Sequence, residues 1–221
     1  MSGITLGSLD LAALLCSRVC HDLISPVGAI VNGLEVLEES KDEETKTFAL
    51  DLIKKSARVG SAKLQFCRIA FGAAGSATAQ IDPGDAENVA RGFIEDDKMK
   101  LTWKLPRVFL PKNRAKLLLN MLLIAMQAIP RGGMITVEPI GEGETMSFRV
   151  SSVGMNARVP PVMELLNGGA AGGTVDAHAI QPYYTGLLAR ECGMAVSIVA
   201  EGDAIVFTAQ FADQPVAASP A

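Results

Sequence analysis

The first third of the chain carries one long helical pattern of apolar residues. From Leu9 onward, apolar or small residues recur at alternating spacings of four and three positions, which is typical of the seam of a helical bundle or coiled coil. These positions are Leu9, Ala13, Cys16, Cys20, Leu23, Val27, Ile30, Leu34 and Leu37. The pattern predicts a single helix about 45 Å long.

A short polar segment at residues 40–43 separates this helix from a second one. Ser40 and Glu43 have the spacing of a capping box, which is typical of a helix N-terminus. The second helix has a stripe of the same spacing, interrupted at Lys55, whose members are Phe48, Leu52, Val59, Ala62, Phe66 and Ile69. Two antiparallel helices cannot bury two such stripes against each other alone. We therefore predict that a hairpin at residues 1–75 pairs with a second copy to form a four-helix bundle.

Beyond a small-residue linker at 72–80, the pattern changes to mixed strands and helices. Asp82 and Pro83 are typical of an N-cap and a first-turn proline, and open a helix that we expect to end near Asp96. The order of the later elements predicts an α/β sandwich at 82–211 with helices on one face, so the whole chain is expected to be α+β. These elements are a strand at 101–105, a helix at 113–129, strands at 134–138 and 146–153, a helix at 182–191 and a hairpin at 195–200 and 204–211, with its turn at 201–203. The Ala/Pro-rich tail at 212–221 is expected to be disordered.

Composition and charge exclude several classes of protein. The chain has 221 residues, of which 49% are hydrophobic, so it can bury a core. A net charge of −4 argues against binding to nucleic acid, which requires a basic face. The apolar run at 9–16 is interrupted by Asp10 and lacks a preceding positive region, unlike a signal peptide. No segment approaches about 18 unbroken apolar residues, so we expect no membrane contact and a cytoplasmic location.

The four cysteines form no regular framework and no Cys-x-x-Cys pair. Cys16 and Cys20 lie four positions apart and are followed by His21, which makes a metal site conceivable. Both cysteines fall on the apolar stripe, however, where a reduced cysteine packs as a small hydrophobic residue. We therefore expect no metal ion.

A histidine lies in the middle of the first predicted helix. His21 follows the stripe position Cys20, so it is displaced from the stripe by about 100° and should face solvent. A neutral imidazole is nucleophilic near pH 7, and Asp22 can orient the ring or hold the proton of its other nitrogen. The neighbours on this face are mostly small or polar, so another protein can approach closely; they are Ser17, Arg18, Ile24, Ser25 and Gly28.

Pro26 is the feature that separates this histidine from an incidental surface residue. It removes the backbone donor that would bond to the carbonyl of Asp22, so the helix should bend just past His21. A proline inside a helix costs about 3 kcal/mol. Its presence within an otherwise unbroken stripe favours a function for this segment.

The segment from His21 to Val27 resembles the H-box of dimeric sensor histidine kinases, whose pattern is His, acid, Leu or Ile, two variable residues, then Pro. The resemblance implies that His21 is phosphorylated, that Asp22 is its acidic neighbour, and that Ser25 is the small polar position associated with phosphatase chemistry. Most of 82–211 resembles the ATP-binding domain of the same kinases.

The resemblance fails at the nucleotide-binding positions of that domain. Asn120 matches the first asparagine of the kinase N-box, but Ile124 stands where the second asparagine binds Mg²⁺. Ser152 stands where an aspartate reads adenine, and the later glycine box is reduced to residues 185–188. The glycines at 168–173 lack the Gly-Lys-Ser/Thr of a phosphate loop and predict a flexible loop. Because Mg²⁺ requires oxygen ligands, we expect this chain to bind neither ATP nor metal.

A histidine-bearing hairpin joined to a degenerate kinase domain is similar to the histidine phosphotransferases of the alphaproteobacterial cell-cycle phosphorelay. This resemblance covers nearly the whole chain and implies a homodimer that accepts phosphate on His21 from the receiver of a CckA-like hybrid kinase. It also implies delivery to CtrA-like and CpdR-like response regulators, with Mg²⁺ supplied by the receiver. We expect the receiver to dock beside His21 and to use the C-terminal domain as a second contact. The residues expected to contact the receiver beside His21 are Arg18, Ile24, Ser25 and Gly28.

Two other functions compete with this hypothesis. An active sensor-type kinase explains the H-box but not the altered nucleotide positions. A non-catalytic dimeric scaffold explains the hairpin and the domain but leaves His21 incidental. The remaining histidine, His178, lies in the Gly-rich loop region and is assigned no role.

Overall fold

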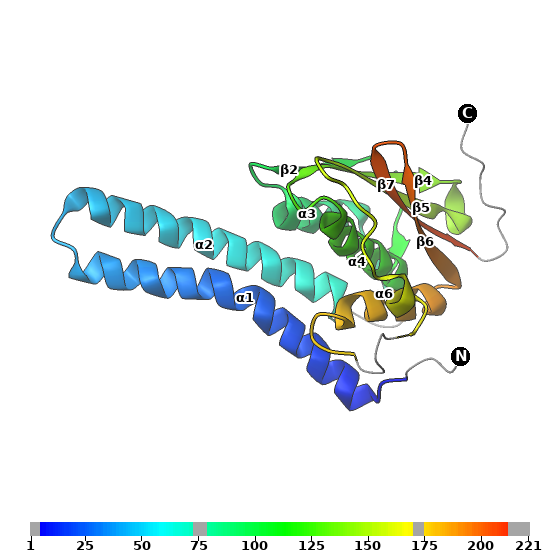
Figure 1. Ribbon diagram of the computed structural model, residues 1–221, viewed down its shortest axis with the longest axis horizontal. Coiled ribbons are helices and arrows are strands. Elements are labelled where there is room, and N and C mark those ends of the chain that lie inside the picture. The colour runs from blue at the N-terminus through cyan, green and yellow to red at the C-terminus, as the bar shows by residue number, and fades with distance from the viewer. Residues whose placement is uncertain (1–4, 73–78, 170–174, 212–221) are drawn as a thin grey trace.

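The computed structural model describes residues 5–72, 79–169 and 175–211. Helices α1 (Ser8–Glu39) and α2 (Glu43–Ala70) form a long antiparallel hairpin, and a unit of strands and helices lies beside one end of it (Figure 1). The predicted hairpin is therefore confirmed. Most of the predicted linker, and the tail predicted to be disordered, lie outside the described residues.

Asp42 caps α2, so the predicted capping box is wrong. The Asp42 carboxylate accepts hydrogen bonds from the backbone N–H of Thr45 (2.8 Å) and from its hydroxyl (2.7 Å). Ser40 instead accepts a hydrogen bond from the Asp42 N–H, at 3.2 Å. These bonds, the Thr45 hydroxyl first, lower the pKa of Asp42. An ionised carboxylate is a stronger acceptor than a hydroxyl, which explains why it takes the cap.

The two hairpin helices contact each other through small residues. Pro26 and Gly33 are the buried residues of α1, and Ala49 and Ser56 are buried opposite them on α2. A Cβ added to Gly33 would lie 2.7 Å from the Cγ1 of Ile53, closer than real contacts allow. The backbones therefore approach too closely at this point for a larger side chain.

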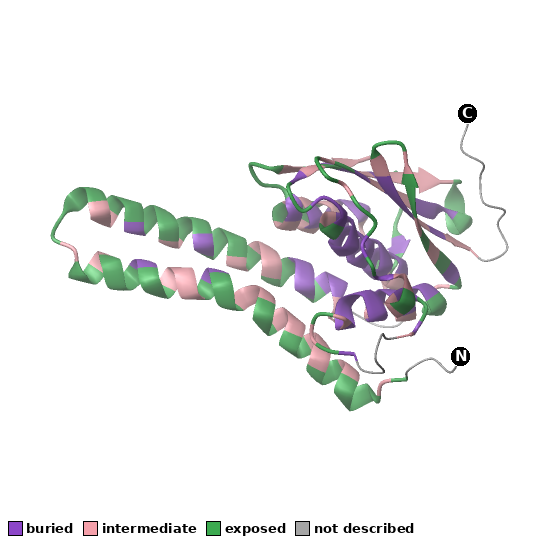
Figure 2. Cartoon of the chain, viewed as in Figure 1, coloured by how far each residue is buried: buried purple, intermediate pink, exposed green. Residues whose placement is uncertain are grey.

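As predicted, the contact between these two helices does not bury the whole of the two apolar stripes. Val27, Leu34 and Phe48 each adjoin a buried small residue in sequence, and are 53%, 44% and 67% exposed. Cys16 and Cys20 are also exposed, so their predicted burial is wrong for the single chain. Exposed and half-buried residues run along most of the hairpin (Figure 2). Several of the larger apolar side chains are thus left outside the intramolecular contact.

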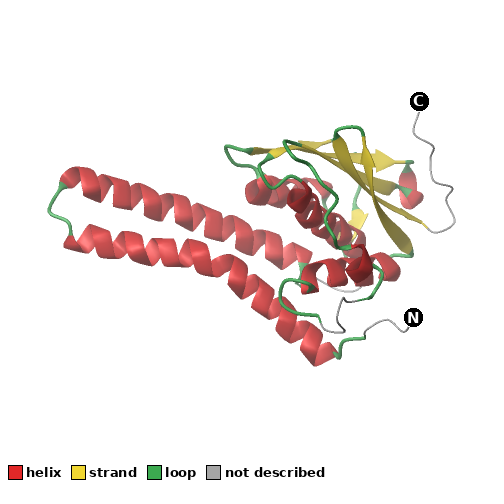
Figure 3. Cartoon of the chain, viewed as in Figure 1, coloured by secondary structure: helices red, strands yellow, loops and turns green. Residues whose placement is uncertain are grey.

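A five-stranded sheet of order β2-β4-β5-β7-β6 forms the second unit. Its helices lie together on one face of the sheet, as predicted (Figure 3). The β2–β4 pair is parallel and the other pairs are antiparallel. The bounds are α3 (Pro83–Ile94), β2 (Met99–Trp103), α4 (Lys112–Ala128), β4 (Gly133–Ile140), β5 (Ser147–Val153), α6 (Ile180–Glu191), β6 (Met194–Glu201) and β7 (Ala204–Phe211).

The predicted elements agree with these bounds to within a few residues, and four short elements were not predicted. They are β1 (Gln80–Ile81), which pairs with β3 (Leu110–Pro111), a 3-10 turn η1 (Gly143–Thr145) and α5 (Met163–Leu166). Each has only two to four residues, too few to display a period. The N-terminal end of α3 is as predicted, because Asp82 accepts a hydrogen bond from the N–H of Gly84 at 2.6 Å.

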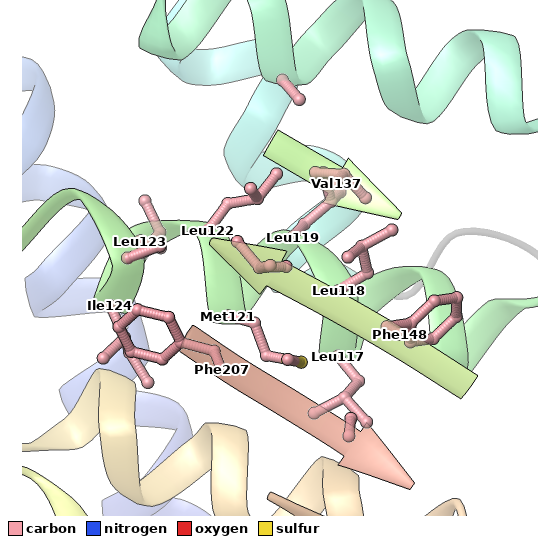
Figure 4. Close-up of a cluster of buried hydrophobic side chains, with 14 of the residues drawn as sticks. Leu117, Leu118, Leu119, Met121, Leu122, Leu123, Ile124, Val137, Phe148 and Phe207 are labelled. Atoms are coloured by element: carbon pink, nitrogen blue, oxygen red, sulfur yellow. The ribbon is translucent and has the colours of Figure 1, made fainter. Parts of the chain in front are cut away.

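Helix α4 is the centre of the core and is buried on nearly all sides. Its apolar side chains pack toward Val137, Phe148 and Phe207 of the sheet (Figure 4). The end of α2 enters the same core through Phe66, which is fully buried and lies 4.3 Å from the ring of Phe93 between centroids. The hairpin and the sheet unit therefore share one core.

By length and apolar composition, α1 could also cross a membrane. One such helix is weak evidence for a membrane span, because core helices and signal sequences have the same length and apolar composition. Only 6% of its most apolar window is buried in the single chain. The absence of a membrane contact stays a prediction.

Candidate functional site

His21 lies midway along α1 with 68% of its side chain exposed, as predicted. Its Nδ1 is 3.5 Å from Oδ1 of Asp22. The other carboxylate oxygen of Asp22 accepts a hydrogen bond from Nε of Arg18 at 3.0 Å, and both of these side chains are largely buried. The structure therefore brings Arg18, His21 and Asp22 together, with the carboxylate held beside one ring nitrogen.

Pro26 acts on the backbone as the sequence predicts. It cannot donate to the carbonyl of Asp22, and Nζ of Lys63 on α2 donates to that oxygen instead, at 3.0 Å. Helix α1 bends along this stretch (Figure 1). The carbonyl of Asp22, which has no donor from Pro26, thus links the histidine segment to the second helix through a hydrogen bond.

The remaining predicted site residues form an open helix surface next to the histidine. Ile24 is 69% exposed, and Ser25 is also exposed. A Cβ added to Gly28 would meet no atom within 4 Å. Another protein can therefore approach this side of His21 without steric hindrance from the residues that the structure describes.

His178 lies against His21, so the sequence-based assignment of no role to this residue missed a contact. The two ring centroids are 5.8 Å apart and the planes meet at 77°, an edge-to-face arrangement. His178 precedes α6 and is exposed. No periodicity or motif in the sequence marks it, because the contact depends on how α6 packs on α1.

Both hydrogen bonds and apolar packing hold the segment that carries His178 in place. Oδ1 of Asp176 accepts hydrogen bonds from the N–H groups of His178 (2.9 Å) and Ala179 (2.8 Å). These bonds, Ala179 first, lower the pKa of Asp176. The flanking Val175, Ile180 and Tyr183 form a buried cluster, against which several residues of α1 pack, namely Leu11, Leu14 and Leu15.

Asn120, the one retained N-box residue, is used inside the protein. It is fully buried, and its Nδ2 donates to the carbonyls of Ala70 (3.0 Å) and Lys116 (2.9 Å). Its Oδ1 accepts a hydrogen bond from Nε2 of Gln181 at 3.2 Å. The amide therefore joins α4 to α2 and α6.

The other nucleotide positions are also enclosed. Ile124 is 1% exposed within the core, and the hydroxyl of Ser152 donates to the carbonyl of Ala125 at 3.0 Å. Helix α5 packs so tightly on Gly186 of α6 that a Cβ there would overlap the backbone of Leu166. The residues at these positions therefore contribute to packing of the core.

No group of three or more His, Cys, Asp or Glu side chains within the described ranges is placed to hold a metal ion. Burial raises the pKa of the Cys67 thiol to about 11, and that of Cys192 to about 11. These two thiols are therefore poor nucleophiles at neutral pH.

This chain is similar in sequence and in structure to several known proteins. Residues 83–204 match the model of the histidine phosphotransferase C-terminal domain. The protein phosphotransferase ChpT of Brucella abortus (strain 2308) is 56% identical over 208 residues, which cover 94% of this chain and 98% of that protein. A solved structure described as a bacterial phosphotransferase superposes with a TM-score of 0.87 at 54% identity, covering 95% of this chain and 100% of the other. A histidine kinase domain from Erythrobacter litoralis EL346 matches 84% of this chain and 95% of its own length, with a TM-score of 0.43 and 15% identity.

Proposed function

The chain belongs to the histidine phosphotransferase family, and from this premise we propose that it carries phosphoryl groups on His21 in a multi-step phosphorelay. The observation that carries the proposal is the exposed His21 ring with the carboxylate of Asp22 held at its Nδ1. This arrangement favours the tautomer with hydrogen on Nδ1, which leaves a lone pair on Nε2 for attack on phosphorus.

In the acceptance step, Nε2 of the neutral His21 ring attacks the phosphorus of a receiver's aspartyl phosphate. The N–P bond forms while the bond from phosphorus to the aspartate oxygen breaks, and the aspartate leaves as a carboxylate. The ring then bears a positive charge, which Asp22 stabilises through the Nδ1 hydrogen. Delivery is the reverse reaction, with the carboxylate of a second receiver as nucleophile.

The partner is a receiver domain that docks over Arg18, Ile24, Ser25 and Gly28. The open surface at Gly28 and the exposed Ile24 support this placement. Phosphoryl transfer depends chiefly on positioning and charge neutralisation, and the receiver supplies the Mg²⁺. By resemblance, the donor is a CckA-like hybrid kinase and the acceptors are CtrA-like and CpdR-like regulators. The same resemblance supports a cytoplasmic location.

The active form is a homodimer with a four-helix bundle. The hairpin uses small residues for its own contact and leaves larger apolar side chains exposed, among them Val27, Val31 and Leu34 on α1 and Leu50 on α2. Burying such a side chain fully contributes about 1.5–3 kcal/mol, so this surface favours association. A second hairpin has the length and the apolar pattern to cover it.

Replacing both Val27 and Leu34 with aspartate is expected to convert the dimer to a folded monomer. Two carboxylates buried in the interface without partners would raise the dimer dissociation constant by at least about 10²-fold. Sedimentation velocity measures the change, and circular dichroism checks the helix content. The matched control is Asn32→Asp, which adds a charge at an exposed polar position of the same helix. A double variant that stays dimeric would place the interface elsewhere.

The C-terminal unit does not bind ATP. The amide of Asn120 is bonded within the core, Ile124 offers no oxygen to a metal, and Ser152 is bonded to a backbone carbonyl. These observations support the loss of both the metal ligand and the adenine-binding carboxylate. They favour a phosphotransferase over an autokinase, while the held Asp22 favours it over an inert scaffold.

Calorimetric titration of the chain with ATP and Mg²⁺ is expected to show no saturable heat up to about 1 mM. A charge-assisted hydrogen bond to adenine is worth about 1.5–3 kcal/mol, which alone is about a 10- to 100-fold loss of affinity. The loss of the metal ligand weakens binding further. Saturable binding in the micromolar range, or self-labelling by radiolabelled ATP, would contradict this assignment.

A further inference from the structure

We propose that His178 is a positioning residue for His21. This inference rests on the proposed role of His21 as the phosphoryl carrier and adds a second residue to that site. The two imidazole rings lie edge to face with centroids 5.8 Å apart and planes at 77°. One ring comes from the middle of α1 and the other from the turn that precedes α6.

The contact with His178 restricts rotation of the His21 side chain. Aromatic rings attract each other in edge-to-face pairs with centroids 4.5–7 Å apart, and this pair falls within that range. At 68% exposure, His21 has few other neighbours to restrict its rotamer. Asp22 holds the ring at Nδ1, and His178 holds the plane of the ring. Together they keep Nε2 directed toward an incoming phosphorus atom.

His178 is placed by the fold and does not depend on a loose loop for its position. Asp176 bonds to two successive N–H groups of the turn, at 2.9 and 2.8 Å. Immediately after it, the buried Ile180 and Tyr183 pack against α1, and the contacted residues include Leu14, two helical turns before His21. The segment that carries His178 is therefore docked on the helix that carries His21.

This arrangement gives the C-terminal unit a role in transfer without a nucleotide. The unit brings one side chain to the phosphorylated helix and so links the placement of α6 to the geometry of His21. Small errors of position are costly in group transfer, where a misplacement of about 1 Å can slow a reaction by 10²-fold. Loss of a single ring contact on an exposed side chain should lower the transfer rate about 10-fold.

The test measures single-turnover transfer of labelled phosphate from a phosphorylated receiver domain to the full chain, over a range of receiver concentrations. His178→Ala is expected to lower the maximal rate about 10-fold and to change the half-saturating receiver concentration by less than about twofold. His178→Phe keeps an aromatic ring at the contact and is expected to retain at least half of the wild-type rate. Thermal unfolding of each variant checks that the fold is intact.

Each other outcome overturns the inference. An unchanged rate in His178→Ala shows that the contact has no effect on transfer. A raised half-saturating concentration with an unchanged maximal rate makes His178 a docking contact instead. Equal losses in His178→Phe and His178→Ala exclude the ring contact as the cause. A wild-type chain that accepts no label would refute the proposed function itself, which separates that failure from the failure of the inference.

Discussion

His21→Ala is expected to abolish acceptance of phosphate from a receiver, lowering the rate by at least about 10³-fold. The variant loses the nucleophilic nitrogen, and neither Asp22, which is bound to Arg18, nor Lys63, which donates to a backbone carbonyl, can replace it. The measurement is the transfer of label from a phosphorylated receiver domain, followed by separation of the two proteins. Stability should change little, because the side chain is largely exposed.

His178→Ala is the matched control for this experiment, since it removes the other histidine of the pair. It should still accept label, although more slowly, because His21 and Asp22 remain. If His21→Ala accepts label at the wild-type rate, the phosphoryl carrier is another residue and the proposed mechanism is wrong. Label found on His178 in that variant would identify the carrier.

Gly28→Trp is expected to reduce transfer at least about 10²-fold while leaving the dimer intact. Gly28 lies two helical turns beyond His21, and none of the described residues occupies the space next to it. An indole there would project into the volume that we assign to the receiver. It would keep the receiver's aspartate from reaching the phosphorus in line. The expected signature is a lower transfer rate with unchanged sedimentation and unchanged unfolding temperature.

Glu44→Trp controls for the introduction of an exposed tryptophan on the hairpin. Glu44 is exposed in the first turn of α2, at the opposite end of the hairpin from the C-terminal unit. This variant should transfer phosphate at the wild-type rate. Normal transfer by Gly28→Trp would show that the receiver docks on another surface of the hairpin.

The longer elements of this fold could be predicted from the sequence because each has a local cause. The four-three spacing of apolar residues predicted both hairpin helices, and Asp82 with Pro83 marked the start of α3. The bend at Pro26 could be predicted as well, because the missing N–H and the freed Asp22 carbonyl lie four residues apart. The H-box residues needed no tertiary information, since His21 and Asp22 are adjacent in the chain.

The partner of each element was decided only by the tertiary structure. Periodicity identified the apolar stripes, but the close approach at Gly33 decides that α1 meets α2 through small residues and leaves Val27 and Leu34 exposed. A stripe defines a face of a helix, and a displacement of one residue rotates the contact by about 100° without changing the pattern. The choice of Asp42 over Ser40 as the cap of α2 likewise depended on the geometry of the turn.

Tertiary packing also explains why the contacts of Asn120 and of His178 could not be predicted from the sequence. Asn120 matches a nucleotide-binding motif, but its amide bonds to Ala70 and Gln181, which only packing brings to α4. His178 carries no local signal, and it reaches His21 because Ile180 and Tyr183 pack on the start of α1. The sequence alone determined the longer elements and marked His21 as the candidate phosphoryl carrier, because the signals for both lie within a few residues. Tertiary packing decided which distant groups surround that histidine, because those contacts follow from the burial of apolar faces that are far apart in the chain.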